Sequence, residues 1–209
     1  MTDRRRVRAY LGLGANLGDA AGTLAWAVTR LQAVPKARVV GVSPLYATAA
    51  WGVTDQPEFR NAVVALDVAR VAGQTAEAGA LDLLARLKVM ERDAGRRPGR
   101  RWGPRELDLD LLVFGRHRIV VERTPQARSL DADTDPEKAG RRLEVPHRDL
   151  GERLFVLAPL ADLAPRLVPP GWHETVATRR RRVAAQEDPG AVRLVGAWEP
   201  AAGRWRAGP

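Results

Sequence analysis

The 209-residue sequence contains no cysteine, which excludes disulfide bridges, thiolate zinc sites and a cysteine nucleophile. It has only three histidines, and their wide spacing does not predict a metal site. No apolar run is long enough to span a membrane, and the short apolar stretch near the N-terminus is too short for a signal-peptide core. We therefore expect a cytoplasmic protein with no membrane partner.

Lysine is scarce as well, because only three of the 34 basic residues are lysines. The excess over 25 acidic residues gives a formal net charge of +9, nearly all of it from arginine. Such a charge can indicate nucleic-acid binding. However, a chain that is also rich in alanine, glycine and proline can owe its arginines to genome base composition. The positions of the arginines are therefore more informative than their number.

The remaining composition is that of an ordinary globular protein, with 45% hydrophobic and 28% charged residues. The length suits one domain with extensions. We expect a single domain over residues 1–185, with a polar insertion at about 124–141. Residues 186–209 are rich in glycine, proline and alanine, which predicts a loosely ordered C-terminal extension.

Hydrophobic periodicity predicts an alternating series of strands and helices. A helix capped by Asp19 follows the first strand, and a loop over 48–57 precedes the third. The order strand, helix, strand, strand, helix, strand predicts an α+β, ferredoxin-like split βαβ core, with a mainly antiparallel sheet and helices packed on it. The expected strands are 7–13, 38–45, 59–66 and 107–114, the second core helix is 79–94, and shorter helices are expected at 155–163 and 172–185.

Two aspartates alternate with leucines in the last of these strands, Asp108 and Asp110 in the segment LDLDL. The two-residue period of a strand puts both carboxylates on one face, with α-carbons about 6 to 7 Å apart. Magnesium is typically held by one or two carboxylates together with nucleotide phosphates. The alternative is an edge strand with a solvated acidic face.

An arginine-rich loop, residues 96–105, immediately precedes this strand. Guanidinium groups bind phosphate oxygens bidentately, and arginine with metal stabilises charge during phosphoryl transfer. The loop therefore predicts a phosphate clamp, with Trp102 as part of a lid over the ligand. The alternative is a solvated loop that forms salt bridges with the aspartates.

A glycine-containing segment, residues 11–18, does not match a dinucleotide-binding or P-loop motif, because the third glycine and the Gly-Lys-Ser/Thr are missing. Its glycines permit close backbone approach, while Asn16 caps a turn or meets a ligand. His147 is the one histidine of interest, because it follows Pro146 and has several arginines nearby.

Four segments resemble the 6-hydroxymethyl-7,8-dihydropterin pyrophosphokinase family over about residues 10–165. They are YLGLGANLGD at 10–19, SPLYATAAWGVTDQPEFRNAVV at 43–64, RRWGPRELDLDLLVFG at 100–115 and VPHRDLGERLFVLAPL at 145–160. The resemblance implies transfer of pyrophosphate from ATP to the hydroxymethyl group of the pterin, with release of AMP. In this chain a segment at about 124–140 is inserted before Arg142, so the alignment of Arg142 depends on where the insertion is closed.

The resemblance also implies roles for individual residues. Two magnesium ions would bind to Asp108 and Asp110, with ATP as co-substrate. The catalytic group would be Arg96, Arg105, Asp108 and Asp110. The ATP contacts would be Arg96, Arg105, Arg142, His147 and Arg153. The pterin contacts would be Thr48, Phe59, Asn61 and Phe155, with the two rings stacking on the pterin. The lid would contain Arg101 and Trp102, and Glu91 would assist from the preceding helix.

Two alternatives stay open at this point. The first is a two-metal nucleotidyltransferase, although the glycine segment lies far from the aspartates for that class. The second is a basic nucleic-acid-binding domain that uses residues 96–105 and 179–182, although the interleaved aromatic and basic residues of RNA-binding sheets are missing. We expect a monomer that acts on small molecules, without a nucleic-acid partner.

Overall fold

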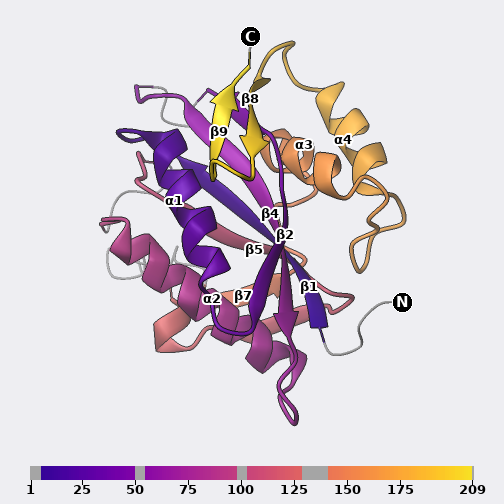
Figure 1. The fold of residues 1–209 in the computed structure, drawn as a ribbon. Helices are drawn as coiled ribbons and strands as arrows, with labels where there is room; N and C mark the ends of the chain where they lie inside the picture. Colours follow the sequence, from indigo (N-terminus) through magenta and orange to yellow (C-terminus); the bar gives the residue numbers. More distant parts are fainter. Residues whose placement is uncertain (1–5, 50–54, 98–102, 129–140, 209) are drawn as a thin grey trace.

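The structure is a computed structural model that describes residues 6–49, 55–97, 103–128 and 141–208 (Figure 1). The elements along these ranges are β1 (Arg6–Ala15), α1 (Ala20–Gln32), β2 (Ala37–Val42), β3 (Leu45–Thr48), β4 (Phe59–Ala69), α2 (Ala76–Asp93), β5 (Asp108–Phe114), β6 (Ile119–Glu122), the 3-10 turn η1 (Pro125–Ala127), β7 (Arg142–Val145), α3 (Leu154–Leu163), α4 (Val176–Ala184), β8 (Val192–Glu199) and β9 (Arg204–Ala207).

In the described ranges, seven of the strands form one sheet in the order β5-β1-β4-β3-β8-β9, and β2 also pairs with β4. The neighbouring strands are antiparallel. Strands β6 and β7 form a separate two-stranded sheet. The predicted α+β class and ferredoxin-like order are confirmed, because β1 lies between β5 and β4 while β2 and β3 both pair with β4.

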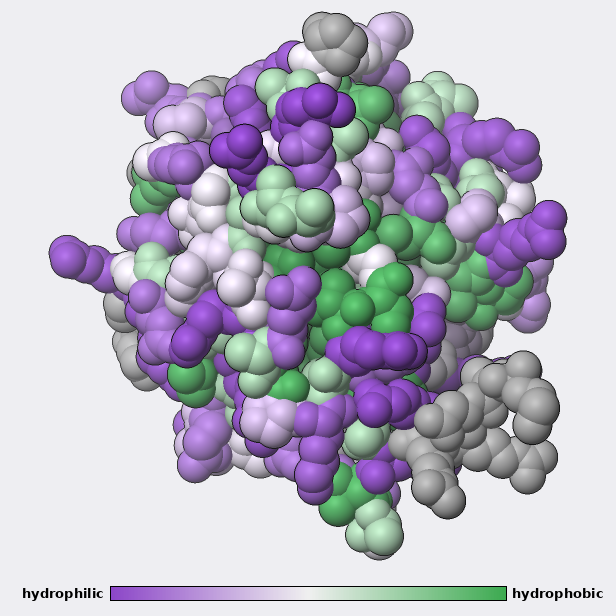
Figure 2. Space-filling model, viewed as in Figure 1, coloured by the Kyte–Doolittle hydropathy of each residue, from purple (hydrophilic) through white to green (hydrophobic). Residues whose placement is uncertain are grey.

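The two faces of the sheet are covered by different helices (Figure 1). Helices α1 and α2 pack on one face, where every second residue of β1, such as Leu11 and Leu13, is buried. Helices α3 and α4 pack on the other face, against residues such as Val63 and Ala65 of β4. Figure 2 shows polar and charged side chains over most of the visible surface, with an apolar area near its centre.

Helices α1, α2 and α4 begin at residues whose side chains cap them, whereas α3 begins after Arg153 without a side-chain cap. The carboxylate of Asp19 accepts a hydrogen bond from the Gly22 backbone at 2.9 Å, as the sequence predicted. Thr75 and Thr175 cap α2 and α4 in the same way. None of the helices in the described part of the chain is long and apolar enough to cross a membrane.

The structure differs from the sequence predictions at the second strand. The strand predicted at 38–45 is divided into β2 and β3 at Ser43 and Pro44, because Pro44 has no N–H for the ladder. Within the polar insertion, residues 125–127 form η1, whereas 129–140 lie outside the described residues.

The C-terminal segment also differs from the prediction, since it is not loosely ordered. Strands β8 and β9 form a hairpin, and β8 pairs with β3 in the main sheet. The sequence prediction rested on glycine and proline content, but β9 alternates polar and apolar residues in the segment RWRA, and its Trp205 is buried. Packing of its tryptophans therefore outweighs the local composition.

Candidate active site

Asp108 and Asp110 lie on the face of β5 that points toward the α3 side of the sheet. The leucines between and after them, Leu109 and Leu111, belong to the core under α1 and α2. The two carboxylates therefore share the opposite face, and both residues are half-buried.

The neighbouring strand leaves room above these carboxylates. In the register of β1 and β5, Gly14 lies opposite Asp108 and Gly12 lies opposite Asp110. Because residues directly opposite share a face, two side chains are missing where they would otherwise cover the aspartates. The Leu112 side chain fills the space over Gly12, whereas a Cβ at Gly14 would meet only Asn61 Oδ1, at 3.4 Å, among the described residues. The open strip beside the carboxylates therefore lies at Gly14.

A buried ionic network supports Asp108 from the side of α2. Arg96 Nη1 lies 2.6 Å from Asp108 Oδ1 and 2.8 Å from Glu91 Oε2, and the Arg96 side chain is only 3% exposed. Arg105 Nη1 lies farther away, 3.8 Å from Asp108 Oδ1. The Arg96 guanidinium thus binds two carboxylates at once, which fixes the Asp108 side chain.

The same network holds the backbone between the two aspartates. Glu91 Oε1 accepts a hydrogen bond from Leu109 N at 2.7 Å, and Lys88 Nζ donates to Leu109 O at 3.0 Å. Lys88 and Glu91 also form an ion pair of 2.6 Å. Strand β5 lies at the edge of the sheet, so α2 satisfies the outward backbone groups that an edge strand leaves open.

The acidic groups of this network have shifted pKa values. Burial raises the pKa of Glu91, although Lys88 and Arg96 oppose this shift. Burial also acts to raise the pKa of Asp108, but the positive charges of Arg96 and Lys88 outweigh it and lower the pKa overall. Asp108 is therefore ionised near neutral pH.

Asn16 connects the two loops that border the site. Its side-chain oxygen accepts from Arg105 N at 2.7 Å, while its amide donates to Gln56 Oε1 and Pro57 O, both at 3.0 Å. Asn16 is buried, and these bonds use its side-chain donors and acceptor. It therefore acts as a link between the segments before β4 and β5, which the sequence analysis left open as a turn cap or a ligand contact.

The predicted pterin contacts gather at the β3–β4 end of the same face. Asn61 lies opposite Gly14, and Phe59 lies opposite Thr48. Asn61 Nδ2 donates to Thr48 Oγ1 at 2.9 Å, and both residues are buried. Phe59 is half-buried and does not belong to either hydrophobic cluster of the described residues.

Phe155 lies in the first turn of α3 and is likewise half-buried and outside both clusters of the described residues. The Arg153 guanidinium carbon lies 5.8 Å from the centre of its ring, and Arg153 also pairs with Asp149 at 2.5 Å. The backbone N–H of His147 donates a hydrogen bond to Leu112 O of β5 at 2.8 Å, which fixes this segment beside the strand. His147, Arg153 and Phe155 therefore lie on the same side of the sheet as the two aspartates.

Arg123, which the sequence analysis did not select, follows β6 directly. In that strand Ile119 is buried whereas Val120 is 60% exposed, so the alternation directs Arg123 to the same side as Ile119. The pKa of Arg123 is lowered overall, because burial lowers it more than the negative charges of Asp110 and Glu91 raise it. The signal available in the sequence was this alternation of apolar residues.

Arg142 has a different environment from Arg123. It lies opposite Glu122 in the β6–β7 ladder and is exposed, while the adjacent Leu143 is buried. Arg142 O accepts a hydrogen bond from Arg123 Nε at 3.2 Å. The structure therefore places the Arg142 side chain on the outward side of this hairpin.

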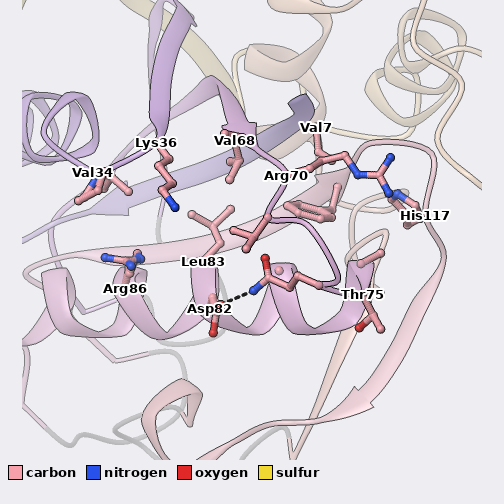
Figure 3. A pocket seen from close by; sticks show the side chains of 17 residues that line it. Val7, Val34, Lys36, Val68, Arg70, Thr75, Asp82, Leu83, Arg86 and His117 are labelled. Carbon is pink, nitrogen blue, oxygen red and sulfur yellow. Dashed lines mark hydrogen bonds between the residues drawn. The ribbon is translucent and has the colours of Figure 1, made fainter. Parts of the chain in front are cut away.

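The predicted lid residues Arg101 and Trp102 lie outside the described residues. A cavity of about 200 Å³ is present at the opposite end of the sheet, between α2 and the ends of β1 and β4 (Figure 3). Its floor includes Val7, Val68 and Leu83, and none of the predicted site residues lines it. We place the site at the aspartates and not at this cavity, because the aspartates combine charge, an open strip and nearby arginines.

The residues that the structure describes include no group of three or more histidine, aspartate or glutamate side chains placed to hold a metal ion. Asp108 and Asp110 alone fit a magnesium ion that takes its remaining ligands from water and phosphate oxygens. Asp108 is already shared with Arg96 and Arg105, so Asp110 is the aspartate whose carboxylate is less occupied by the described residues.

Comparisons with known proteins agree with this geometry. The sequence profile of the family described as 7,8-dihydro-6-hydroxymethylpterin-pyrophosphokinase matches residues 10–165. A protein of Methylorubrum extorquens named 2-amino-4-hydroxy-6-hydroxymethyldihydropteridine pyrophosphokinase is 41% identical over 188 residues, covering 90% of this chain and 98% of the relative. The protein of the same name from Pseudomonas aeruginosa is 39% identical over 167 residues, covering 79% and 86%.

Solved structures share the fold at low sequence identity. A Plasmodium falciparum HPPK-DHPS triple mutant superposes with a TM-score of 0.66 and 14% identity, covering 99% of this chain. The chain spans about half the length of that protein, 49%. The relatives named here support neither the nucleotidyltransferase nor the nucleic-acid-binding alternative.

Proposed function

Since this chain belongs to the 7,8-dihydro-6-hydroxymethylpterin-pyrophosphokinase family, we propose that the open strip beside Asp108 and Asp110 is the place where its two substrates meet. The chain is an ATP-dependent pyrophosphokinase of folate biosynthesis. It transfers pyrophosphate from ATP to the hydroxymethyl group of 6-hydroxymethyl-7,8-dihydropterin and releases AMP. The observation that carries the site assignment is the pair of aspartates on one face opposite two glycines.

The two aspartates would hold two magnesium ions, which supply positive charge to the ATP phosphates. Asp110 would be the freer ligand, whereas Asp108 is shared with Arg96. Arg96 is almost fully buried between two carboxylates, so we assign it mainly to the positioning of Asp108. Arg105, which is 3.8 Å from Asp108, would reach the phosphates together with His147 and Arg153.

The pterin would lie at the β3–β4 end of the strip. Phe59 and Phe155 would stack on its ring, because both phenyl rings are half-buried without being part of a hydrophobic cluster of the described residues. Asn61 and Thr48 would form hydrogen bonds with its polar edge. The apolar faces and the hydrogen-bonding rim together suit a planar heterocycle.

In the reaction, the hydroxymethyl oxygen of the pterin attacks the β-phosphorus of ATP. The bond between the β-phosphorus and the oxygen bridging to the α-phosphate breaks, so AMP leaves with that oxygen, and the hydroxyl proton passes to solvent. No covalent enzyme intermediate is required. The protein aligns the two substrates and stabilises the charge that moves to the leaving AMP.

The test is an assay of the purified chain with magnesium, ATP and the reduced hydroxymethylpterin, with nucleotide products separated by chromatography. We expect AMP in a 1:1 ratio with pterin pyrophosphate. Asp110→Ala should reduce kcat/KM by about 1,000-fold or more, because it removes a metal ligand that acts in the transition state. Release of pyrophosphate instead of AMP would support a nucleotidyltransferase and would overturn the proposal.

A further inference from the structure

The C-terminal hairpin of β8 and β9 lies outside residues 10–165, which the family profile matches. Even so, it is joined to the strand that carries Thr48. In the antiparallel pairing of β3 and β8, Val192 lies opposite Thr48 and Leu194 lies opposite Tyr46. Without β8, the four-residue strand β3 would be the exposed edge of the main sheet.

The register puts Val192 on the site face. Residues directly opposite in an antiparallel pair share a face, so Val192, Thr48 and Phe59 form one row across β8, β3 and β4. Val192 is half-buried and packs against the hydrophobic cluster under α3. Leu194 is on the same face but is 63% exposed. The apolar contact of the hairpin with the site side of the sheet is therefore made at Val192.

Two further contacts link the hairpin to the strands of the pterin end. Trp205 Nε1 donates to Ser43 O at 2.8 Å just before β3, and its ring meets Trp198 edge-on with centroids 4.6 Å apart. Arg193 Nη2 lies 2.5 Å from Glu58 Oε1, and Glu58 immediately precedes Phe59. The hairpin thus contacts β3 at its beginning and β4 at its beginning.

We infer that residues 192–207 are a working part of the pterin end of the site, with Val192 as a positioning residue that acts through Thr48. The inference rests on the proposed function, because it takes Thr48 and Phe59 as pterin contacts. By fixing β3 in the sheet, the hairpin keeps the Thr48 hydroxyl where Asn61 and the pterin can both reach it. The ATP end of the site, on β5 and α2, lies at the other edge of the sheet from the hairpin and does not depend on it.

The experiment compares Val192→Ala, Val192→Ile and Leu194→Ala in the full chain. Leu194→Ala is the matched control, since it truncates an apolar side chain on the same strand and face that lies farther out. We expect Val192→Ala to raise the KM for the pterin about fivefold and to change the KM for ATP by less than about twofold. Val192→Ile and Leu194→Ala should each keep the parent KM for the pterin.

Thermal unfolding of each variant separates a local effect from general loss of stability. The inference is wrong if Val192→Ala behaves as Leu194→Ala does, or if both KM values rise together as the Tm falls. A parent chain that formed no AMP from ATP and the pterin would instead overturn the proposed function, and the inference with it. An active parent with an unaffected Val192→Ala overturns the inference alone.

Discussion

Aspartates at opposite ends of the same sheet, Asp67 and Asp108, both pair with arginine but have different neighbours. Asp67 of β4 lies opposite Arg8 of β1 and Arg38 of β2, so three strands contribute one closed row of charges. Arg8 Nε is 2.5 Å from Asp67 Oδ1, and Arg38 Nη2 is 3.5 Å from Oδ2. The charge of Asp67 is therefore neutralised by arginines of the sheet itself.

At the other end, the row that begins at Asp108 continues through Gly14 to Asn61. The cation that pairs with Asp108 comes from Arg96 after α2 and not from a neighbouring strand. The sheet face beside the carboxylate therefore stays open. The comparison teaches that residues opposite a carboxylate decide whether it is structural or free to bind a ligand.

The largest expected effect comes from closing the open row. Gly14→Arg would place a cation opposite Asp108, as Arg8 is placed opposite Asp67. We expect kcat/KM to fall about 1,000-fold or more, because the new side chain neutralises Asp108 and fills the strip. Steady-state assays of AMP formation measure the loss.

Gly14→Ala is the control for this change, because an added Cβ would meet only Asn61 Oδ1, at 3.4 Å, among the residues that the structure describes. It should keep most of the activity and the parent Tm. Full activity of a folded Gly14→Arg protein would show that the strip is not where the substrates bind.

The next largest effect is expected in the buried network of Lys88, Glu91 and Arg96, which supports Asp108 and has no counterpart at Asp67. Glu91→Gln should lower the free energy of unfolding by about 3 kcal/mol, because it leaves buried Lys88 and Arg96 without their shared carboxylate. Urea unfolding at pH 7 measures this change. Asp93→Asn is the matched control on the same helix, since Asp93 forms only an exposed pair with Arg30 and should contribute about 0.5 kcal/mol or less. Equal losses in the two variants would contradict the distinction.

A third prediction separates the two arginines of the β6–β7 hairpin. Arg123→Ala should reduce kcat/KM about 10- to 100-fold, because its half-buried guanidinium interacts electrostatically with Asp110 and would meet the triphosphate. Arg142→Ala should stay within about twofold, because its side chain is exposed on the outward side. Measurement of both variants with ATP varied tests this, and a larger loss in Arg142→Ala would reverse the assignment.

Much of the fold could be predicted from local sequence patterns. The periodicity around Leu24 and Leu84 and the cap at Asp19 gave α1 and α2 because these signals are local. The C-terminal hairpin could not be predicted in this way. Its stability depends on Trp205 reaching Ser43, a contact between residues 162 positions apart.

The residues of the site likewise differ in whether local sequence patterns can predict them. The shared face of Asp108 and Asp110 follows from the two-residue period of a strand. The position of Gly14 opposite Asp108, in contrast, is known only once β1 is paired with β5. The sequence analysis did not select Arg123 for a related reason. An insertion separates it from the motif around His147, and only the pairing of β6 with β7 shows which arginine points inward.

The smallest expected effect is the pH-dependent contribution of Asp67, in the closed row with Arg8 and Arg38, to the stability of the fold. The hydrogen bond from Arg8 lowers the pKa of Asp67 and outweighs burial, which raises it. The unfolded pKa of an aspartate is about 3.9. Because the folded-state pKa is lower, ionised Asp67 stabilises the folded protein above about pH 4, and this contribution is lost as the pH falls through the folded-state pKa.

Asp67→Asn should therefore unfold more easily than the parent by about 1 kcal/mol at pH 7, and the difference should shrink as the pH falls below about 4. Urea unfolding of both proteins at pH 7, 5, 4 and 3 follows the difference, and the parallel assay should show unchanged kcat/KM because Asp67 lies at the opposite end of β4 from Phe59. A difference that stayed constant over this range would mean that Asp67 contributes through packing. A loss of activity in Asp67→Asn would show that the closed row also affects the substrates, and the contrast between the two ends of the sheet would then fail.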